Sequence, residues 1–299
     1  MTPETSPLRA WFFLVAFSFR RQAKLRQMVG IAAGILLVSV LLVVLFTVTT
    51  GWDRLEQRLT RVQPFLAEHV AGSMVHPVIE DSPLMERIRE ESTPQAVFSR
   101  WVIFVLYLGF LLPLFSISFA TGALGTERES RSLVWLMTRP LPRSAIYLAK
   151  FLGLLPWCLG LSFGGFALLC LAGGDVGREA FAWYAPGVLA GSVAFAAVFH
   201  LFGALFSRPA VVGLLYAFFF ETMLSELPIP GTLKRLSLNY YTRCLLYDAG
   251  ERRGVPTESA SLFVPVSPTF AWVALLLATV GLTAVGMWLF ARNEYRDDS

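Results

Sequence analysis

Long apolar runs separated by short polar segments make up most of the chain. A helix needs roughly 20 apolar residues to cross ~30 Å of hydrocarbon, and five of the runs meet that length directly. The pattern therefore predicts an all-α integral membrane protein with six transmembrane helices. The six runs lie at about 28–50, 101–124, 151–172, 183–206, 210–227 and 270–290.

The fifth run is the short one. From Ala210 its uninterrupted apolar part ends at Phe220, which at about 1.5 Å per residue cannot cross a bilayer. It crosses only if Glu221 lies inside the membrane. A carboxylate there costs about 2.5–3.5 kcal/mol, so it faces protein or water. Glu221 is either a polar site at the outer mouth of a pathway or a structural hydrogen-bond acceptor that holds this helix to its neighbours; we favour the structural interpretation.

Composition excludes a soluble domain. The chain has 299 residues, of which 55% are hydrophobic and 15% charged, with a mean hydropathy of +0.59. A soluble protein of this length needs far more charged surface. The formal charge of +4 is modest, and we expect membrane lipid, and no nucleic acid, as a partner.

The first 27 residues predict a cytoplasmic helix that lies in the membrane interface. The segment lacks a cleavage site, so it is not a cleavable signal. An aromatic face followed by a basic cluster is typical of an interfacial helix, and the alternative is a basic flank that orients the first span. The face consists of Leu8, Trp11, Phe12, Val15 and Phe19, and the cluster of Arg20, Arg21, Lys24 and Arg26. We divide the chain into this helix, 1–27, and one transmembrane domain, 28–299.

The distribution of basic residues predicts the orientation. Segment 1–27 carries five basic residues and one acidic residue, and segment 125–150 carries five and two. Basic residues in short loops mark the cytoplasmic side. Both termini are therefore expected in the cytoplasm, in a bacterial-type inner membrane. Segments 51–100 and 228–268 are then extracytoplasmic.

Several single residues invite a chemical interpretation. His69 and His76 share a loop with Glu80 and Asp81, but this spacing matches no established ligand pattern, so we predict no metal site. We interpret His200 as an interhelical contact in preference to a proton relay. Two small-xxx-small pairs predict helix-packing sites; they are Gly160 with Gly164, and Gly187 with Gly191.

Segment 125–150 is a charged island between two apolar runs. Glu127 and Glu129 are expected in the first turn of a helix, where the macrodipole favours acids. An apolar stripe follows, Pro140 and Pro142 end the helix, and Ser144 can cap the next one. The stripe is Leu133, Leu136 and Met137. A loop that only obeys the orientation rule needs no such stripe, so we expect another protein to bind here.

The chain also lacks the sequence features of an enzyme. No G-x-x-x-x-G-K-[ST] phosphate loop occurs in it, and no nucleophile stands in a recognisable elbow. If ATP drives the protein, the ATPase is a separate polypeptide. We therefore expect no enzymatic activity and no cofactor in this chain.

The charged island resembles the permease subunits of ABC-2 type transporters. Its pattern is E-x-E-x-x-[ST]-L-x-x-L-x-x-x-P-x-x-R, with a lysine before the next span. Arg131 and Ser132 stand where the family usually has Gly-Thr. The six-span layout, the aromatic-basic N-terminal segment and the stretch from Glu221 through 233–241 are also similar to the family. The matching residues are Glu127, Glu129, Ser132, Leu133, Leu136, Pro140, Arg143 and Lys150.

The resemblance implies a mechanism. Such permeases pair as homodimers or pseudo-dimers and bind two ATPase subunits, which hold the ATP and magnesium. The charged island acts as a cytoplasmic coupling helix, and the spans rearrange when the ATPases close. The implied coupling residues are Glu127, Glu129, Leu133, Leu136, Met137, Arg139, Pro140 and Arg143.

Three functions stay open at this point. The leading one is substrate export across the inner membrane, driven by the separate ATPase. The second keeps the ATPase but transmits force through segment 51–100 to an extracytoplasmic partner, without transport. The third is a membrane scaffold or sensor with no ATPase.

Overall fold

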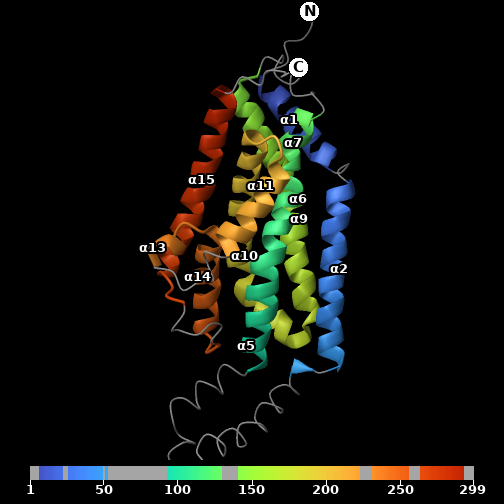
Figure 1. Ribbon diagram of the computed structural model, residues 1–299, viewed down its shortest axis with the longest axis vertical. Helices are drawn as coiled ribbons and strands as arrows, with labels where there is room; N and C mark the ends of the chain where they lie inside the picture. Colours follow the sequence, from blue (N-terminus) through green and yellow to red (C-terminus); the bar gives the residue numbers. More distant parts are fainter. Residues whose placement is uncertain are drawn as a thin grey trace, which may run out of the picture.

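The computed structural model describes residues 7–22, 26–49, 51–52, 93–129, 141–222, 231–255 and 263–292. Within these ranges every regular element is a helix, and the long helices run alongside one another in a bundle (Figure 1). Five helices of the described part are long and apolar enough to cross a membrane. The predicted class, an all-α integral membrane protein, is therefore confirmed.

The five long helices correspond to five of the predicted spans. One of them is a succession of shorter elements that together run from Pro94 to Gly125. It consists of α5 (Pro94–Phe98), the π-helix η1 (Ser99–Leu111), α6 (Leu112–Ala120) and the start of α7 (Gly122–Glu129). The other four are α2 (Arg26–Thr49), α9 (Arg143–Ala172), α10 (Gly174–Leu205) and α15 (Pro268–Arg292).

The fifth predicted span, 210–227, is not a full crossing within the described residues. It begins as α11 (Pro209–Leu215) and continues as a second π-helix, η2 (Tyr216–Thr222). Its apolar part, Pro209–Glu221, is shorter than the five long helices. The six-span layout therefore stays a prediction.

The end of η1 coincides with a proline. The backbone N–H of Leu112 bonds to the carbonyl of Tyr107, five residues back, which is the bonding pattern of a π-helix. Pro113 follows and has no N–H to donate, so the π pattern cannot continue through it. The chain then winds as the α-helix α6, with Pro113 in its first turn.

Helix α10 begins earlier than its apolar run. The sequence predicts a span from residue 183, but the helix starts at Gly174, directly after α9. Gly174 has a φ of +68°, which glycine adopts without strain. The charged first turns stay helical, with an ion pair of 3.1 Å between Asp175 and Arg178. Hydropathy alone misplaces this start, because these polar turns belong to the helix but not to the apolar run.

Helix α10 lies at the centre of the bundle, in contact with α9, α15, α14 (Leu238–Glu251) and α6. In its most apolar stretch 72% of the residues are buried, against 22% in α2 and 17% in α15. The last two helices are thus peripheral, and most of their apolar side chains face outward. In a membrane protein, outward-facing apolar side chains are solvated by lipid.

Candidate functional site

A small hydrophobic cluster joins five helices at one end of the bundle. We name it the end cluster. Two of these helices, α7 and α9, flank residues 130–140, the middle of the charged island. The first described helix, α1 (Pro7–Gln22), also takes part. The end cluster consists of Leu14 from α1, Leu124 from α7, Ile146, Tyr147 and Ala149 from α9, Ala204 from α10 and Phe290 from α15.

The structure corrects the predicted position of the two glutamates. Glu127 and Glu129 lie in the last residues of α7, which begins at Gly122, and not in the first turn of a helix. The helix starts earlier because Ala123 and Leu124 are buried in the bundle. The macrodipole argument for these acids therefore fails.

The structure describes only some of the remaining predicted coupling residues of the island. Leu133, Leu136, Met137, Arg139 and Pro140 lie outside the described residues.

Arg143 is the first residue of α9 and is exposed. Pro142 occupies the N-cap position and makes no side-chain bond there. The predicted cap at Ser144 is wrong, because Ser144 already lies inside the helix.

Helix α1 is bound tightly to α9. Trp11 Nε1 donates a hydrogen bond of 2.8 Å to the carbonyl of Ala145, and Trp157 Nε1 donates one of 2.9 Å to the carbonyl of Phe19. Between them, a Cβ on Gly153 would lie 2.7 Å from Ser18 Cβ. Only glycine permits this approach, so α1 and the first half of α9 form one packed unit.

The predicted aromatic face of α1 divides in two. Trp11 and Val15 are half-buried, while Leu8, Phe12 and Phe19 are exposed. The buried side is lined by Leu14 and other residues that contact the bundle. The exposed aromatic side chains suit a membrane interface.

His200 lies between aromatic rings of α9. Its ring is fully buried, with its centroid 4.5 Å from that of Tyr147 and 5.6 Å from that of Phe151. Lys150 is also buried on α9. The arrangement agrees with the interpretation of His200 as an interhelical contact.

Glu221 accepts four hydrogen bonds. Its Oε1 accepts from Tyr216 Oη at 2.5 Å and from the backbone N–H of Leu238 at 3.2 Å. Its Oε2 accepts from Ser237 Oγ at 2.5 Å and from the backbone N–H of Asn239 at 2.9 Å. The side chain is fully buried. A carboxylate with this many donors can stay buried because hydrogen bonds to the charged form replace water.

These bonds place Glu221 at the N-terminus of α14. Ser237 is the N-cap residue, and its hydroxyl also accepts from the N–H of Tyr240 at 3.1 Å. A negative charge at a helix N-terminus is stabilised by the free N–H groups and the macrodipole. Glu221 thus joins the last described turn of η2 to the N-terminus of α14.

Sequence reasoning did not identify Tyr216 or Ser237 as partners of Glu221. A serine before the amphipathic stretch 238–251 is an N-cap signal that could have located the start of α14. Nothing in the local sequence connects that cap to a carboxylate 16 residues earlier.

Tyr240, on α14, is held by a hydrogen bond of its own. Burial raises the pKa of Tyr240 to about 12, so its hydroxyl stays protonated and donates to the carbonyl of Val264 at 2.7 Å.

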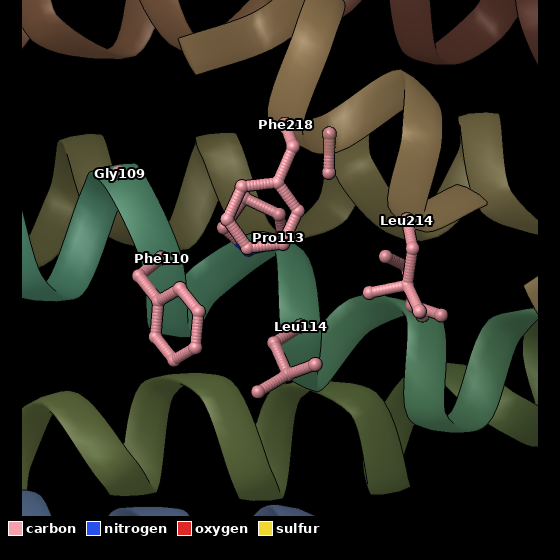
Figure 2. A pocket seen from close by; sticks show the side chains of 8 residues that line it. Gly109, Phe110, Pro113, Leu114, Leu214 and Phe218 are labelled. Carbon is pink, nitrogen blue, oxygen red and sulfur yellow. The ribbon is translucent and has the colours of Figure 1, made fainter. Parts of the chain in front are cut away.

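An apolar hollow lies between the two π-helices. It is small and partly open, and Figure 2 shows the rings of Phe110 and Phe218 beside it, with Pro113 below Phe218 and Leu114 directly after Pro113 on α6. The centroids of Phe110 and Phe218 are 5.7 Å apart. Its lining comes from η1 and α6 on one side and α11 and η2 on the other: Gly109, Phe110, Pro113, Leu114, Ile117, Leu214, Ala217 and Phe218.

A family model described as ABC-2 family transporter protein matches residues 74–229, which is more than half of the chain. The chain belongs to the ABC-2 transporter family. It is a membrane permease of the ABC transporter class, as its charged island predicts. No curated protein sequence matches the chain.

The matched range contains part of the candidate site of the permease. It covers the charged island, both π-helices and Glu221. Helices α1, α2, α14 and α15 lie outside it. Permeases of this family are normally non-enzymatic transmembrane subunits, in agreement with the missing phosphate loop in the sequence.

The two predicted glycine pairs of the permease differ. A Cβ on Gly187 would lie 2.7 Å from Leu246 Cδ1, and one on Gly191 would lie 2.7 Å from Thr242 Oγ1, so this pair packs α10 against α14 as predicted. Around Gly160 and Gly164 no atom lies within 4 Å of such a Cβ. The second pair is therefore not a packing site within the described chain.

The histidines considered as metal ligands, His69 and His76, lie outside the described residues, as do Glu80 and Asp81. Among the residues that the structure describes, no group of three or more histidine, cysteine or acidic side chains could hold a metal ion.

Proposed function

We propose that this ABC-2 permease exports a substrate across a bacterial inner membrane, driven by a separate ATPase that binds the charged island, 125–150. The observation that carries the proposal is the end cluster. Helices α7 and α9 flank residues 130–140, the middle of the island, and both pack in the end cluster against α1, α10 and α15. Force applied to the island would reach all five helices, because packed helices move as rigid bodies.

The sequence supports an energy source outside this chain. It contains no phosphate loop, while the ABC transporter class uses ATP. Two ATPase subunits, carrying ATP and magnesium, would therefore bind a dimer of permeases. We propose Glu127, Glu129 and Arg143 as polar contacts of the ATPase, with Leu133, Leu136, Met137, Arg139 and Pro140 forming the rest of the coupling helix.

The proposed orientation places the end cluster at the cytoplasmic end of the bundle. The described ends of α1 and α15 lie at the same end of the bundle (Figure 1). Basic residues gather there, among them Arg20, Arg21 and Arg292, as expected for a cytoplasmic face. Helix α1 would then lie in the inner interface, with its exposed phenylalanines in lipid.

A second candidate function is force transmission without transport. Trp52 is the last described residue before segment 53–92, and Phe98 lies shortly after it. Their rings meet edge to face at 5.1 Å, and Trp52 Nε1 donates to Thr47 Oγ1 at 3.0 Å. Both ends of this segment are thus fixed to the bundle, so movement of the spans could be passed to an extracytoplasmic partner.

Two measurements test these proposals. A tagged permease purified from its own membrane should bring with it a stoichiometric amount of an ATPase subunit that hydrolyses ATP. A permease that purifies without any ATPase contradicts both the export proposal and the force-transmission proposal. Substrate-stimulated ATP hydrolysis in proteoliposomes favours export. Hydrolysis that responds only to an extracytoplasmic protein favours force transmission.

A further inference from the structure

The hydrogen bond between Tyr216 and Glu221 depends on the winding of η2. The two residues are five apart, and their oxygens are 2.5 Å apart. In an α-helix of 3.6 residues per turn, side chains five apart diverge by about 140° around the axis. The i→i+5 winding of a π-helix brings them to one face. This bond therefore reports, and stabilises, the π form of η2.

The same carboxylate holds a second element. Glu221 accepts from Ser237 and from the N–H groups of Leu238 and Asn239, all in the first turn or cap of α14. One buried side chain thus connects the winding of η2 with the position of α14. Bonds to a charged acceptor are among the stronger ones in proteins.

Helix η2 also lines the hollow. Ala217 and Phe218 of η2 line it together with Gly109 and Phe110 of η1, and Figure 2 shows Phe218 beside Phe110. Rewinding η2 as an α-helix would turn every residue after Tyr216 about the helix axis. Phe218 would then leave its contact with Phe110, because that contact is set by the winding.

We propose that Tyr216, Glu221 and Ser237 form a latch that holds η2 in its π form and α14 in place. Release of the latch rewinds η2, moves Phe218 in the hollow and loosens the N-terminal turn of α14, while the rest of α14 stays packed against α10. Tyr216 is then a positioning residue that acts through Glu221. The inference rests on the proposed transport function only in one respect, namely that transport is the reason for the helices to move. The latch itself can be tested without ATPase or substrate.

The test is amide hydrogen exchange in the purified full-length permease. Tyr216→Phe removes one hydroxyl and keeps the ring. The latch predicts that amide exchange in the variant is at least about tenfold faster than in the wild type, both in η2 and at Leu238 and Asn239. Losing a hydrogen bond to a charged acceptor changes the opening equilibrium by a factor of that order. The control is Tyr241→Phe on α14, which lies outside the latch and should leave exchange in both regions unchanged.

The second variant tests the opposite direction. Coupling between two sites is reciprocal, so Ser237→Ala on the α14 side should in turn speed exchange in η2. This variant also decides the matter if Tyr216→Phe does not fold.

Two outcomes overturn the latch. One is unchanged exchange at Leu238 and Asn239 in Tyr216→Phe, including the case in which only η2 changes, and the other is faster exchange throughout the central helix α10. Failure of the permease to bind an ATPase overturns the proposed function and leaves the exchange result standing.

Discussion

Trp11 on α1 donates a hydrogen bond to the carbonyl of Ala145 on α9, across 2.8 Å. Ala145 lies in the first turn of α9, two residues after Arg143 and within the last part of the charged island, 125–150. Helix α1 is thus bound to the turn into which the proposed coupling segment leads. We therefore expect α1 to move with α7 and α9 as part of the coupling unit.

Trp11→Phe should weaken coupling without unfolding the permease. The change removes one neutral hydrogen bond, worth about 0.5–1.5 kcal/mol, and keeps an aromatic ring at the interface. We expect the substrate-stimulated ATPase rate of the complex to fall about two- to tenfold. Phe12→Leu is the control, because Phe12 is 63% exposed. An equal loss in both variants would contradict the role of the hydrogen bond.

Gly153→Ala should loosen α1 from α9. The new methyl group would lie 2.7 Å from Ser18 Cβ and 3.1 Å from the carbonyl of Val15, and overpacking of this kind costs about 1–3 kcal/mol. Thermal unfolding of the purified permease measures the loss. Gly160→Ala on the same helix meets no atom within 4 Å and should be neutral or slightly stabilising. Equal stability of the two variants would count against the packing.

Gly286→Ala should disturb the end cluster from the side of α15. Its methyl group would lie 2.1 Å from Tyr147 Oη, so α15 or the tyrosine must move. We expect a lower unfolding temperature and reduced coupling. Gly281→Ala, with no atom within 4 Å, is the matched control on that helix. A normal ATPase response in a destabilised Gly286→Ala permease would show that the cluster serves stability alone.

Glu221→Gln and Glu221→Leu should differ in stability. In glutamine one oxygen becomes an N–H₂ donor, so one of the two backbone N–H groups at Leu238 and Asn239 loses its acceptor, at a cost of about 1–3 kcal/mol. Leucine removes every acceptor and should cost more. Unfolding temperatures in the order wild type, Gln, Leu support the structural interpretation. A Gln variant of full stability that loses only transport favours the pathway interpretation instead.

Hydropathy was sufficient for the long helices and insufficient for their ends. An apolar window of about 20 residues predicts α2, α9 and α15 because lipid demands it. It does not predict the charged start of α10, where Asp175 and Arg178 pair with each other. Nor does a small-xxx-small motif distinguish Gly187 from Gly160, since only the fold determines which glycine meets a neighbouring helix.

The candidate site was predictable in kind but not in detail. The sequence indicates that Glu221 is unusual, because an isolated carboxylate is costly in an apolar run. Its partners Ser237 and Asn239 lie 16 and 18 residues further along the sequence. Its bond to Tyr216 requires a π-helical winding, which the hydrophobic periodicity of the sequence does not predict. Likewise, the charged island predicts a protein partner, but it does not predict where its first helix begins. That helix, α7, starts at Gly122, ahead of Glu127, and its early residue Leu124 is buried in the bundle.

The central claim is that the charged island receives force from the ATPase. The most direct measurement is ATP hydrolysis and transport by a permease–ATPase complex carrying Glu127→Lys and Glu129→Lys together. The account predicts a folded, membrane-inserted permease with at least about tenfold lower coupled activity, because like charges across an interface cost several kcal/mol. Complex formation and coupled activity equal to those of the wild type would contradict it.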